Sequence, residues 1–111
     1  MNAPPTPEVI RSYLGAHDRR DADAALATFM QSATVIDDGH EYHGTEEIRD
    51  WLARASTKFT YTRTLLDAES LDASTWVLRN RLDGDFPGGT VELRYRFVLD
   101  EGRISELVIA P

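Results

Sequence analysis

The sequence predicts one α+β domain, with helices in the first half of the chain and a curved, mostly antiparallel sheet in the second half. The 111 residues are enough for one hydrophobic core and too few for two. Up to Lys58, most apolar residues recur at the spacing of amphipathic helices, whereas beyond Lys58 apolar and polar residues alternate as in strands. Helices that precede a run of strands are typical of α+β folds, in which the helices pack on one face of the sheet.

Two helices are predicted near the start of the chain. Residues 1–6 are rich in proline and are expected to form a flexible arm, so the domain is expected to span residues 7–111. Thr6 can cap the first helix with Pro7 in its first turn, and Asp21 can cap a second, shorter helix. The residues expected to face the core are Ile10, Tyr13, Leu14 and His17 in the first helix and Ala25, Leu26, Phe29 and Met30 in the second.

A hairpin and a third helix are predicted next. Residues 33–36 have the composition of a short strand, Asp38-Gly39 is typical of a tight turn, and residues 41–43 would form the returning strand. Thr45 can then cap a third helix, whose acidic first turn suits the positive end of the helix dipole. The apolar stripe of this helix would be formed by Ile48, Trp51 and Leu52.

Four strands complete the prediction, at residues 59–66, 75–83, 90–99 and 103–109. Strict alternation along the middle two strands assigns their faces. The inner face would carry Trp76, Leu78, Asn80 and Leu82 from one strand and Val91, Leu93, Tyr95, Phe97 and Leu99 from the next. The outer face would carry Arg79, Arg81, Arg94 and Arg96, with Glu92 and Glu106 as partners. Because such a surface is self-complementary across a two-fold axis, we expect a homodimer that uses the outer face.

Composition and charge exclude several classes of function. Nineteen acidic residues against twelve Lys and Arg give a formal net charge of −7, and no basic run could neutralise phosphates, so nucleic-acid binding is not expected. Without Cys there is no thiol nucleophile and no thiolate metal site. No apolar run approaches the length of a membrane span, so we expect a cytoplasmic protein that does not bind membranes. The excess of Arg over Lys and the frequent Ala indicate a bacterial source.

Several short motifs together resemble a known family. They are Tyr13-Leu14, Asp21-Ala22-Asp23, Leu26-Ala27-Thr28-Phe29, Ala33-Thr34-Val35 with Asp37, and the run from Gly44 to Trp51. This pattern is similar to the SnoaL-like branch of the nuclear-transport-factor-2-like superfamily, which includes ketosteroid isomerase, polyketide cyclases, scytalone dehydratase and limonene epoxide hydrolase. The resemblance implies a cone-shaped α+β barrel whose helices and sheet enclose a pocket, and a dimer formed through sheet surfaces.

The resemblance also implies roles for four residues. Tyr13 falls where ketosteroid isomerase has its oxyanion-binding tyrosine, Asp37 falls where that enzyme has its general base, and Trp51 takes the place of a pocket aromatic. Tyr95 stands where the isomerase has a second oxyanion donor, a protonated carboxylic acid, and a phenol can still donate a hydrogen bond there. A carboxylate in an apolar cavity can move a proton while a buried phenol stabilises charge on a carbonyl oxygen.

Each candidate also has an ordinary structural explanation. Tyr13 can be a core tyrosine, Asp37 can be a turn residue, and His17, which shares a helix face with Tyr13 and could pair with Asp37, can be a buried structural histidine. His40 and His43 lie among carboxylates, but their spacing matches no zinc pattern, so neither a metal nor another cofactor is expected. The remaining residues expected to line the pocket are Trp76, Asn80 and Phe97.

Two functional hypotheses follow from these observations. In the first, the pocket binds a small apolar carbonyl or hydroxylated compound and performs acid/base chemistry of the isomerase, cyclase or dehydratase type without a cofactor. In the second, the domain is a non-catalytic ligand-binding or dimerisation module. Both hypotheses share the internal pocket, because ligand cavities are mostly apolar with a few convergent polar groups.

Overall fold

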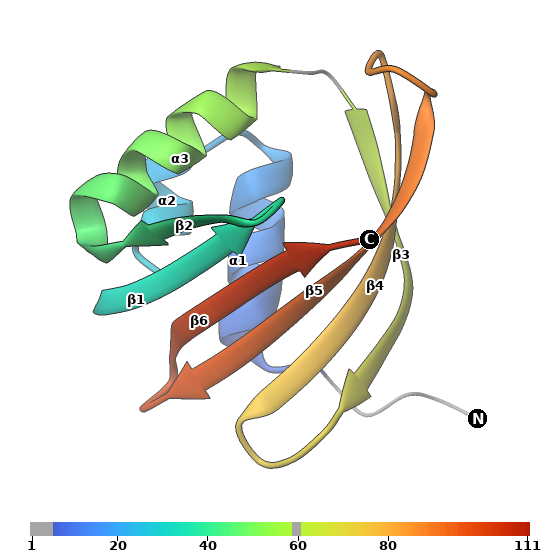
Figure 1. Cartoon of the computed structure of the whole chain (residues 1–111). Helices are drawn as coiled ribbons and strands as arrows, with labels where there is room; N and C mark the ends of the chain where they lie inside the picture. Colours follow the sequence, from blue (N-terminus) through green and yellow to red (C-terminus); the bar gives the residue numbers. More distant parts are fainter. Residues whose placement is uncertain (1–5, 59–60) are drawn as a thin grey trace.

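The computed structural model describes residues 6–58 and 61–111, and this part of the chain forms three helices and six strands (Figure 1). The helices are α1 (Glu8–Asp18), α2 (Ala22–Leu26) and α3 (Gly44–Lys58). The strands are β1 (Phe29–Asp37), β2 (His40–His43), β3 (Tyr61–Ser70), β4 (Thr75–Gly84), β5 (Thr90–Asp100) and β6 (Arg103–Ala110). None of the helices in the described part of the chain is long and apolar enough to cross a membrane.

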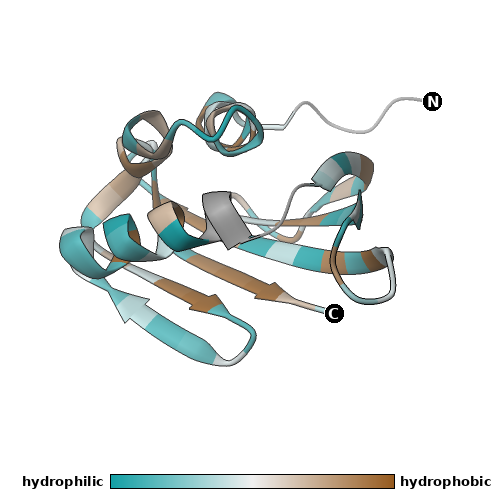
Figure 2. Cartoon of the chain, turned by 90° about the horizontal axis from the view of Figure 1, so that it is seen from above, coloured by the Kyte–Doolittle hydropathy of each residue, from teal (hydrophilic) through white to brown (hydrophobic). Residues whose placement is uncertain are grey.

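The strands form one curved sheet in the order β2-β1-β6-β5-β4-β3. Neighbouring strands are antiparallel, except that β1 and β6 are parallel. The helix α3 connects β2 at one edge of the sheet to β3 at the other edge, and α1 and α2 lie on the same side (Figures 1 and 2). This arrangement confirms the predicted α+β class, with three helices packed on one face of a mostly antiparallel sheet.

The core lies between the helices and the face of the sheet that they cover. The ring of Tyr13, on α1, meets the rings of Phe29 and Phe97 edge to face, at centroid distances of 5.5 and 5.8 Å. Such edge-to-face contacts match the quadrupoles of the rings and add to the energy of burial. The largest fully buried side chains are Tyr13, Phe97, Ile10, Ile48, Leu52, Leu78, Ile104, Leu107, Val35 and Asn80.

The start of α1 differs from the prediction, whereas the start of α2 agrees with it. Pro7, and not Thr6, is the N-cap of α1, with extended backbone angles and no side-chain capping bond. The carbonyl of Pro7 accepts from the N–H groups of Ile10 and Arg11, because proline favours the extended conformation that a cap residue needs. Asp21 caps α2 as predicted, since its Oδ1 accepts from the N–H of Ala24 at 3.1 Å.

The helix α2 is shorter than predicted, and the strand β1 is correspondingly longer. Phe29 and Met30 were expected on the second helix but belong to β1. Phe29 is paired with Ile104 of β6, whose N–H donates to the carbonyl of Thr28 at 2.9 Å. Phe29 is therefore extended because it pairs with a strand some 75 residues later in the sequence. The spacing of apolar residues around Phe29 does not reveal this pairing.

The later strands agree with the prediction, apart from β3. The expected start of β3 at residues 59–60 lies outside the described residues, and the strand continues to Ser70 because the register shifts between Leu65 and Asp67. A bulge of this kind interrupts the alternation that the prediction used. The assignment of faces is confirmed, since alternate residues Trp76, Leu78, Asn80 and Leu82 of β4 are buried.

The predicted turn at Asp38-Gly39 is also confirmed. Asp37 pairs with His40, and the two residues between them have positive φ angles of 54° at Asp38 and 78° at Gly39. Such angles are typical of the two-residue hairpin turn, and Asp and Gly are among the residues that adopt them most readily. The turn fixes Asp37 as the last residue of β1.

We expect Leu107→Ala to destabilise the protein by about 2–5 kcal/mol, because it leaves a cavity in a close-packed core. Leu107 is fully buried and lies between Val35 of β1 and Phe97 of β5. The matched control is Leu71→Ala, which truncates a leucine that is 53% exposed and should change stability by less than about 0.5 kcal/mol. Urea unfolding measures both values, and equal stabilities of the two variants would contradict the core described here.

Candidate functional site

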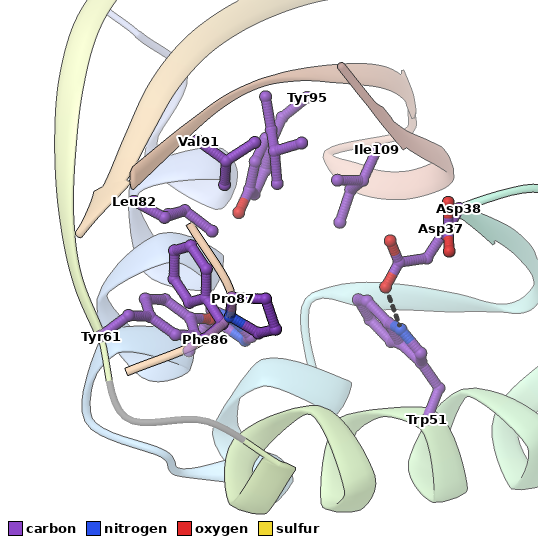
Figure 3. A pocket seen from close by; sticks show the side chains of 12 residues that line it. Asp37, Asp38, Trp51, Tyr61, Leu82, Phe86, Pro87, Val91, Tyr95 and Ile109 are labelled. Atoms are coloured by element: carbon purple, nitrogen blue, oxygen red, sulfur yellow. Dashed lines mark hydrogen bonds between the residues drawn. The ribbon is translucent and has the colours of Figure 1, made fainter. Parts of the chain in front are cut away.

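A cavity of about 330 Å³ lies between the helices α1 and α3 and the end of the sheet where β4 and β5 are joined (Figure 3). Its walls are mostly aromatic and aliphatic, with a few polar groups, as is typical of sites for small molecules. The lining residues are His17, Asp37, Asp38, Trp51, Tyr61, Leu82, Phe86, Pro87, Val91, Leu93, Tyr95 and Ile109.

Asp37 is held at one side of the cavity by Trp51. The indole Nε1 of Trp51, on α3, donates a hydrogen bond to Oδ2 of Asp37 at 2.9 Å (Figure 3). Among the described residues, no hydrogen bond reaches the other carboxylate oxygen, Oδ1. The indole therefore orients the carboxylate and leaves one of its oxygens available to a ligand.

His17 and Tyr61 form a hydrogen-bonded pair in the cavity wall. Nε2 of His17 lies 2.5 Å from the hydroxyl of Tyr61. Burial lowers the pKa of His17 below its usual value, so the imidazole is neutral at pH 7. Burial also raises the pKa of Tyr61, so its phenol keeps the proton. Both groups of the pair are therefore neutral, and when the imidazole donates from Nε2 to the oxygen of Tyr61, the phenol can donate its own hydrogen bond to a ligand.

Tyr95 contributes a third polar group. Its side chain is 2% exposed, and Figure 3 shows it among the labelled residues that face the cavity. No hydrogen bond to its hydroxyl is formed by the residues that the structure describes. Burial raises the pKa of Tyr95, so the phenol stays protonated and can donate to an oxygen atom of a ligand.

Eight residues were predicted for the site, and the structure divides them into two sets. His17, Asp37, Trp51 and Tyr95 line the cavity. Tyr13, Trp76, Asn80 and Phe97 are buried in the core and do not line it.

Tyr13 lies directly behind His17. Their rings stack at a centroid distance of 5.8 Å and an interplanar angle of 18°. Burial raises the pKa of Tyr13, and its buried hydroxyl has no hydrogen-bond partner among the described residues. Tyr13 therefore supports the imidazole of His17 from the core side.

Asn80, itself buried, belongs to a polar cluster that joins α1 to the sheet and extends to the surface at Asp18. Nη1 of Arg63, on β3, donates to Oδ1 of Asn80 at 2.7 Å. The same guanidinium donates from Nε and Nη2 to the two carboxylate oxygens of Asp18 at 3.0 and 2.8 Å. Both ends of the guanidinium are thus engaged within the protein, and Arg63 does not line the cavity.

Phe86 and Pro87, which line the cavity, were not predicted for the site. They lie in the loop between β4 and β5, where Gly88 and Gly89 have positive φ angles of 90° and 72°. The loop is closed by hydrogen bonds from Gly89 N–H to the Phe86 carbonyl and from Gly84 N–H to the Gly89 carbonyl, at 3.0 and 2.9 Å. An aromatic-proline pair inside a glycine-rich hairpin loop is a signal that could have indicated this wall.

One of the hairpin histidines, His43, has local side-chain partners. His43 lies 3.0 Å from Glu41 and 3.2 Å from the hydroxyl of Thr34, at an exposed position. Across residues 6–58 and 61–111, no group of three or more His, Asp or Glu side chains is arranged to hold a metal ion.

Comparison with known proteins now identifies the family. The sequence profile of the SnoaL-like domain matches residues 10–107, so the chain belongs to the SnoaL-like family. A crystal structure from Sinorhizobium meliloti, provisionally described as a polyketide cyclase, is 31% identical, with a TM-score of 0.88 and 95% of each chain covered. The predicted family is therefore confirmed.

More distant structures share the fold. A protein of ketosteroid isomerase-like fold from Catenulispora acidiphila, crystallised with trimethylamine, is 18% identical, with a TM-score of 0.84 over 96% of this chain and 87% of that chain. TerC, co-crystallised with polyporic acid, is 13% identical, with a TM-score of 0.80 over 93% of this chain and 88% of that chain. A comparison with curated proteins gives no match.

We expect His17→Gln to make folding stability less sensitive to acid. Burial lowers the pKa of His17 in the folded protein, so the unfolded chain takes up this proton first as the pH falls below the usual value of 6.5. Stability is therefore lost as the pH drops through 6.5 towards the folded pKa, and the loss is complete below that folded value. Asp18, Arg63, Asp37 and Arg20 are the charged groups whose fields reach His17, and their effects are smaller than that of burial.

Urea unfolding at a series of pH values from about 7.5 to about 5 measures this slope. The control is His40→Gln, at an exposed position of the hairpin, which should keep the slope of the parent protein. Identical slopes for the parent and for His17→Gln would contradict the buried, neutral state of His17.

Proposed function

We propose that the cavity binds a small, largely apolar compound with a carbonyl or hydroxyl group, and that Asp37 moves a proton on it without a cofactor. The observation that carries this proposal is the position of Asp37 in an apolar cavity, fixed by Trp51 and facing hydrogen-bond donors. A positioned carboxylate removes a proton from carbon most easily where nearby donors stabilise the negative charge that develops.

The chemistry follows from the two sides of the cavity. Asp37 takes a proton from a carbon next to the carbonyl group, and the electrons of that bond move to the carbonyl oxygen. The hydroxyl of Tyr95, or that of Tyr61 supported by His17, donates to this oxygen. Return of the proton from Asp37 to another carbon of the same compound completes an isomerisation. In a dehydration, the electrons return from the oxygen to expel a neighbouring hydroxyl, which takes the proton from Asp37 and leaves as water.

Tyr13 has a different role in this proposal from the one that the resemblance implies. Its hydroxyl does not line the cavity, so we assign oxyanion donation to Tyr95 and Tyr61. Tyr13 acts as a positioning residue, because its ring stacks on the imidazole of His17.

A non-catalytic binding module is the second candidate function. The observation that favours it is the composition of the walls, in which Leu82, Pro87, Val91, Leu93 and Ile109 offer only apolar contact. A carrier or sensor needs such walls and one or two polar groups to orient its ligand.

The proposal includes a homodimer formed through the outer face of the sheet. Arg79 pairs with Asp67 and Glu92, and Arg96 pairs with Glu106, at distances between 2.7 and 3.1 Å. Exposed pairs of this kind add little to stability within one chain, whereas a two-fold axis would place the same bidentate groups opposite one another.

Two solved structures with the same fold contain different kinds of small molecule. One of the structures with the same fold was crystallised with an amine and another with an organic acid. The fold itself therefore does not specify the ligand, and the side chains of the cavity decide its class.

We expect Asp37→Asn to lower the rate of proton abstraction by about 10²- to 10⁴-fold, the usual loss for a positioned base. The assay uses 5-nitrobenzisoxazole, a small aromatic compound whose N–O bond breaks when a base removes its C–H proton, which yields a coloured cyanophenolate. Asn keeps the shape of the side chain, so binding of the probe, followed by the tryptophan fluorescence of the protein, should be nearly unchanged.

The matched control is Asp100→Asn, which removes the same charge from an exposed position at the end of β5 and should keep the parent rate. A parent rate no higher than that of Asp37→Asn, with the probe still bound, would reject catalysis and favour the binding module.

We expect the parent protein to have twice the mass of the monomer by light scattering at moderate salt. Arg94→Glu should lower this mass towards the monomer, because it places a negative charge at the centre of the exposed face of β5. The control is Arg11→Glu, the same charge reversal at an exposed position of α1. A monomeric parent protein at high concentration would rule out the dimer.

A further inference from the structure

The charged side chains that line the cavity are all acidic. Asp37 and Asp38 both lie at the end of β1, and neither Lys nor Arg is among the described residues that line the cavity. The partly buried guanidinium of Arg63, on β3, is committed to Asp18 and Asn80. A negative ligand would therefore meet the partly buried carboxylate of Asp37 and the exposed carboxylate of Asp38 beside it without a compensating cation, and burial of such a ligand would be costly.

Asp38 adds a charge that the proposed proton transfer does not use. It occupies the first position of the hairpin turn, with a φ angle of 54°, and so lies beside Asp37 at the same end of the cavity (Figure 3). One carboxylate is enough for a general base. The second carboxylate makes this end of the cavity attractive to a positive group.

Aromatic rings surround the remaining space. Trp51 lies on one side, Tyr61 and Phe86 lie together on the opposite side, and Tyr95 forms part of a third wall (Figure 3). The faces of aromatic rings attract cations, and such enclosures are the usual way in which proteins recognise alkylated ammonium groups. A metal ion or a bare ammonium ion would need more oxygen ligands than this cavity supplies.

The hydroxyl of Tyr95 indicates a further feature of the ligand. Tyr95 is only 2% exposed, and it lines the cavity. Its hydroxyl has no hydrogen-bond partner among the described residues. Buried hydroxyl groups are normally paired, so a ligand with an oxygen atom at this point would satisfy it.

From these observations we propose that the ligand is a small organic cation, an alkylated ammonium compound that also carries a hydroxyl or carbonyl oxygen. The ammonium group lies against the aromatic rings near Asp37 and Asp38, and the oxygen atom reaches Tyr95. The cavity of 330 Å³ equals the volume of about eleven water molecules in the liquid, so the ligand has roughly ten non-hydrogen atoms. This inference rests on the proposed function only in taking the cavity as the ligand site.

The test compares three probes of nearly equal shape by isothermal titration calorimetry of the full chain. Choline is the cation, 3,3-dimethyl-1-butanol is its neutral carbon analogue, and 3,3-dimethylbutanoate is an anion of similar size. We expect choline to bind about tenfold or more tightly than the neutral alcohol, and the anion to bind more weakly than both. The preference for choline should decrease as salt is added.

Asp38→Asn is the variant that tests the role of the second carboxylate. Asn tolerates the positive φ angle, so the turn should be kept. We expect choline affinity to fall by about three- to tenfold while affinity for the neutral alcohol stays the same. Asp100→Asn, which removes an exposed carboxylate elsewhere, should leave both affinities unchanged.

The outcomes separate this inference from the proposed function. If the neutral alcohol binds as tightly as choline, the cation inference is overturned and the ligand cavity stands. If Asp38→Asn weakens both probes equally, the charge of Asp38 does not select the ligand, and the inference is overturned as well. If none of the three probes binds at millimolar concentrations, both the inference and the proposed ligand site are rejected.

Discussion

The partly buried guanidinium of Arg63 is the constraint on which the cavity depends. It ties the end of α1 to β3 and β4, the half of the sheet that curves away from the helices (Figure 1). Its side chain is 11% exposed, whereas that of Asp18 is 40% exposed, so water screens part of the attraction between the charges. The bond to Asn80 matters more, because the buried amide oxygen would otherwise lack this donor. The cluster holds helix and sheet at a fixed separation, with the cavity beside it.

The sequence predicts which face of the sheet is buried, but it does not predict where along that face the core ends and the cavity begins. Alternation places Trp76 and Leu82 on one side of β4, and the structure agrees. Trp76 pairs with Phe97 at the covered end of the sheet, whereas Leu82 pairs with Val91 at the end that lines the cavity. Depth along a strand depends on sheet curvature and helix position, which are set by contacts distant in sequence. Predicted site residues near the covered end are therefore core residues.

The part of the candidate site that lies at a tight turn could be predicted from the sequence, whereas the part that lies in a longer loop could not. The Asp-Gly turn requires positive φ angles, so the sequence alone places Asp37 at a strand end. The position of Phe86 depends on how the connection between β4 and β5, residues 85–89, folds back over the sheet, and no periodic pattern encodes it. The contact of Tyr61 with His17 joins residues 44 positions apart, so no local pattern predicts it. Local rules therefore identified the carboxylate and missed most of the wall opposite it.

The parallel pairing of β1 with β6 has a consequence for the order in which the chain can fold. The last strand of the sheet lies between the first strand and β5, so it alone connects the β1–β2 hairpin to the other strands. While the chain emerges from the ribosome, β1 has β2 as its neighbour but waits for β6 until about 70 further residues have been made. The aromatic contacts of Tyr13 with Phe97 also await the second half of the chain. Assembly of this domain is therefore a late and cooperative event, and a nascent chain that stops before β6 exposes the apolar faces of both halves.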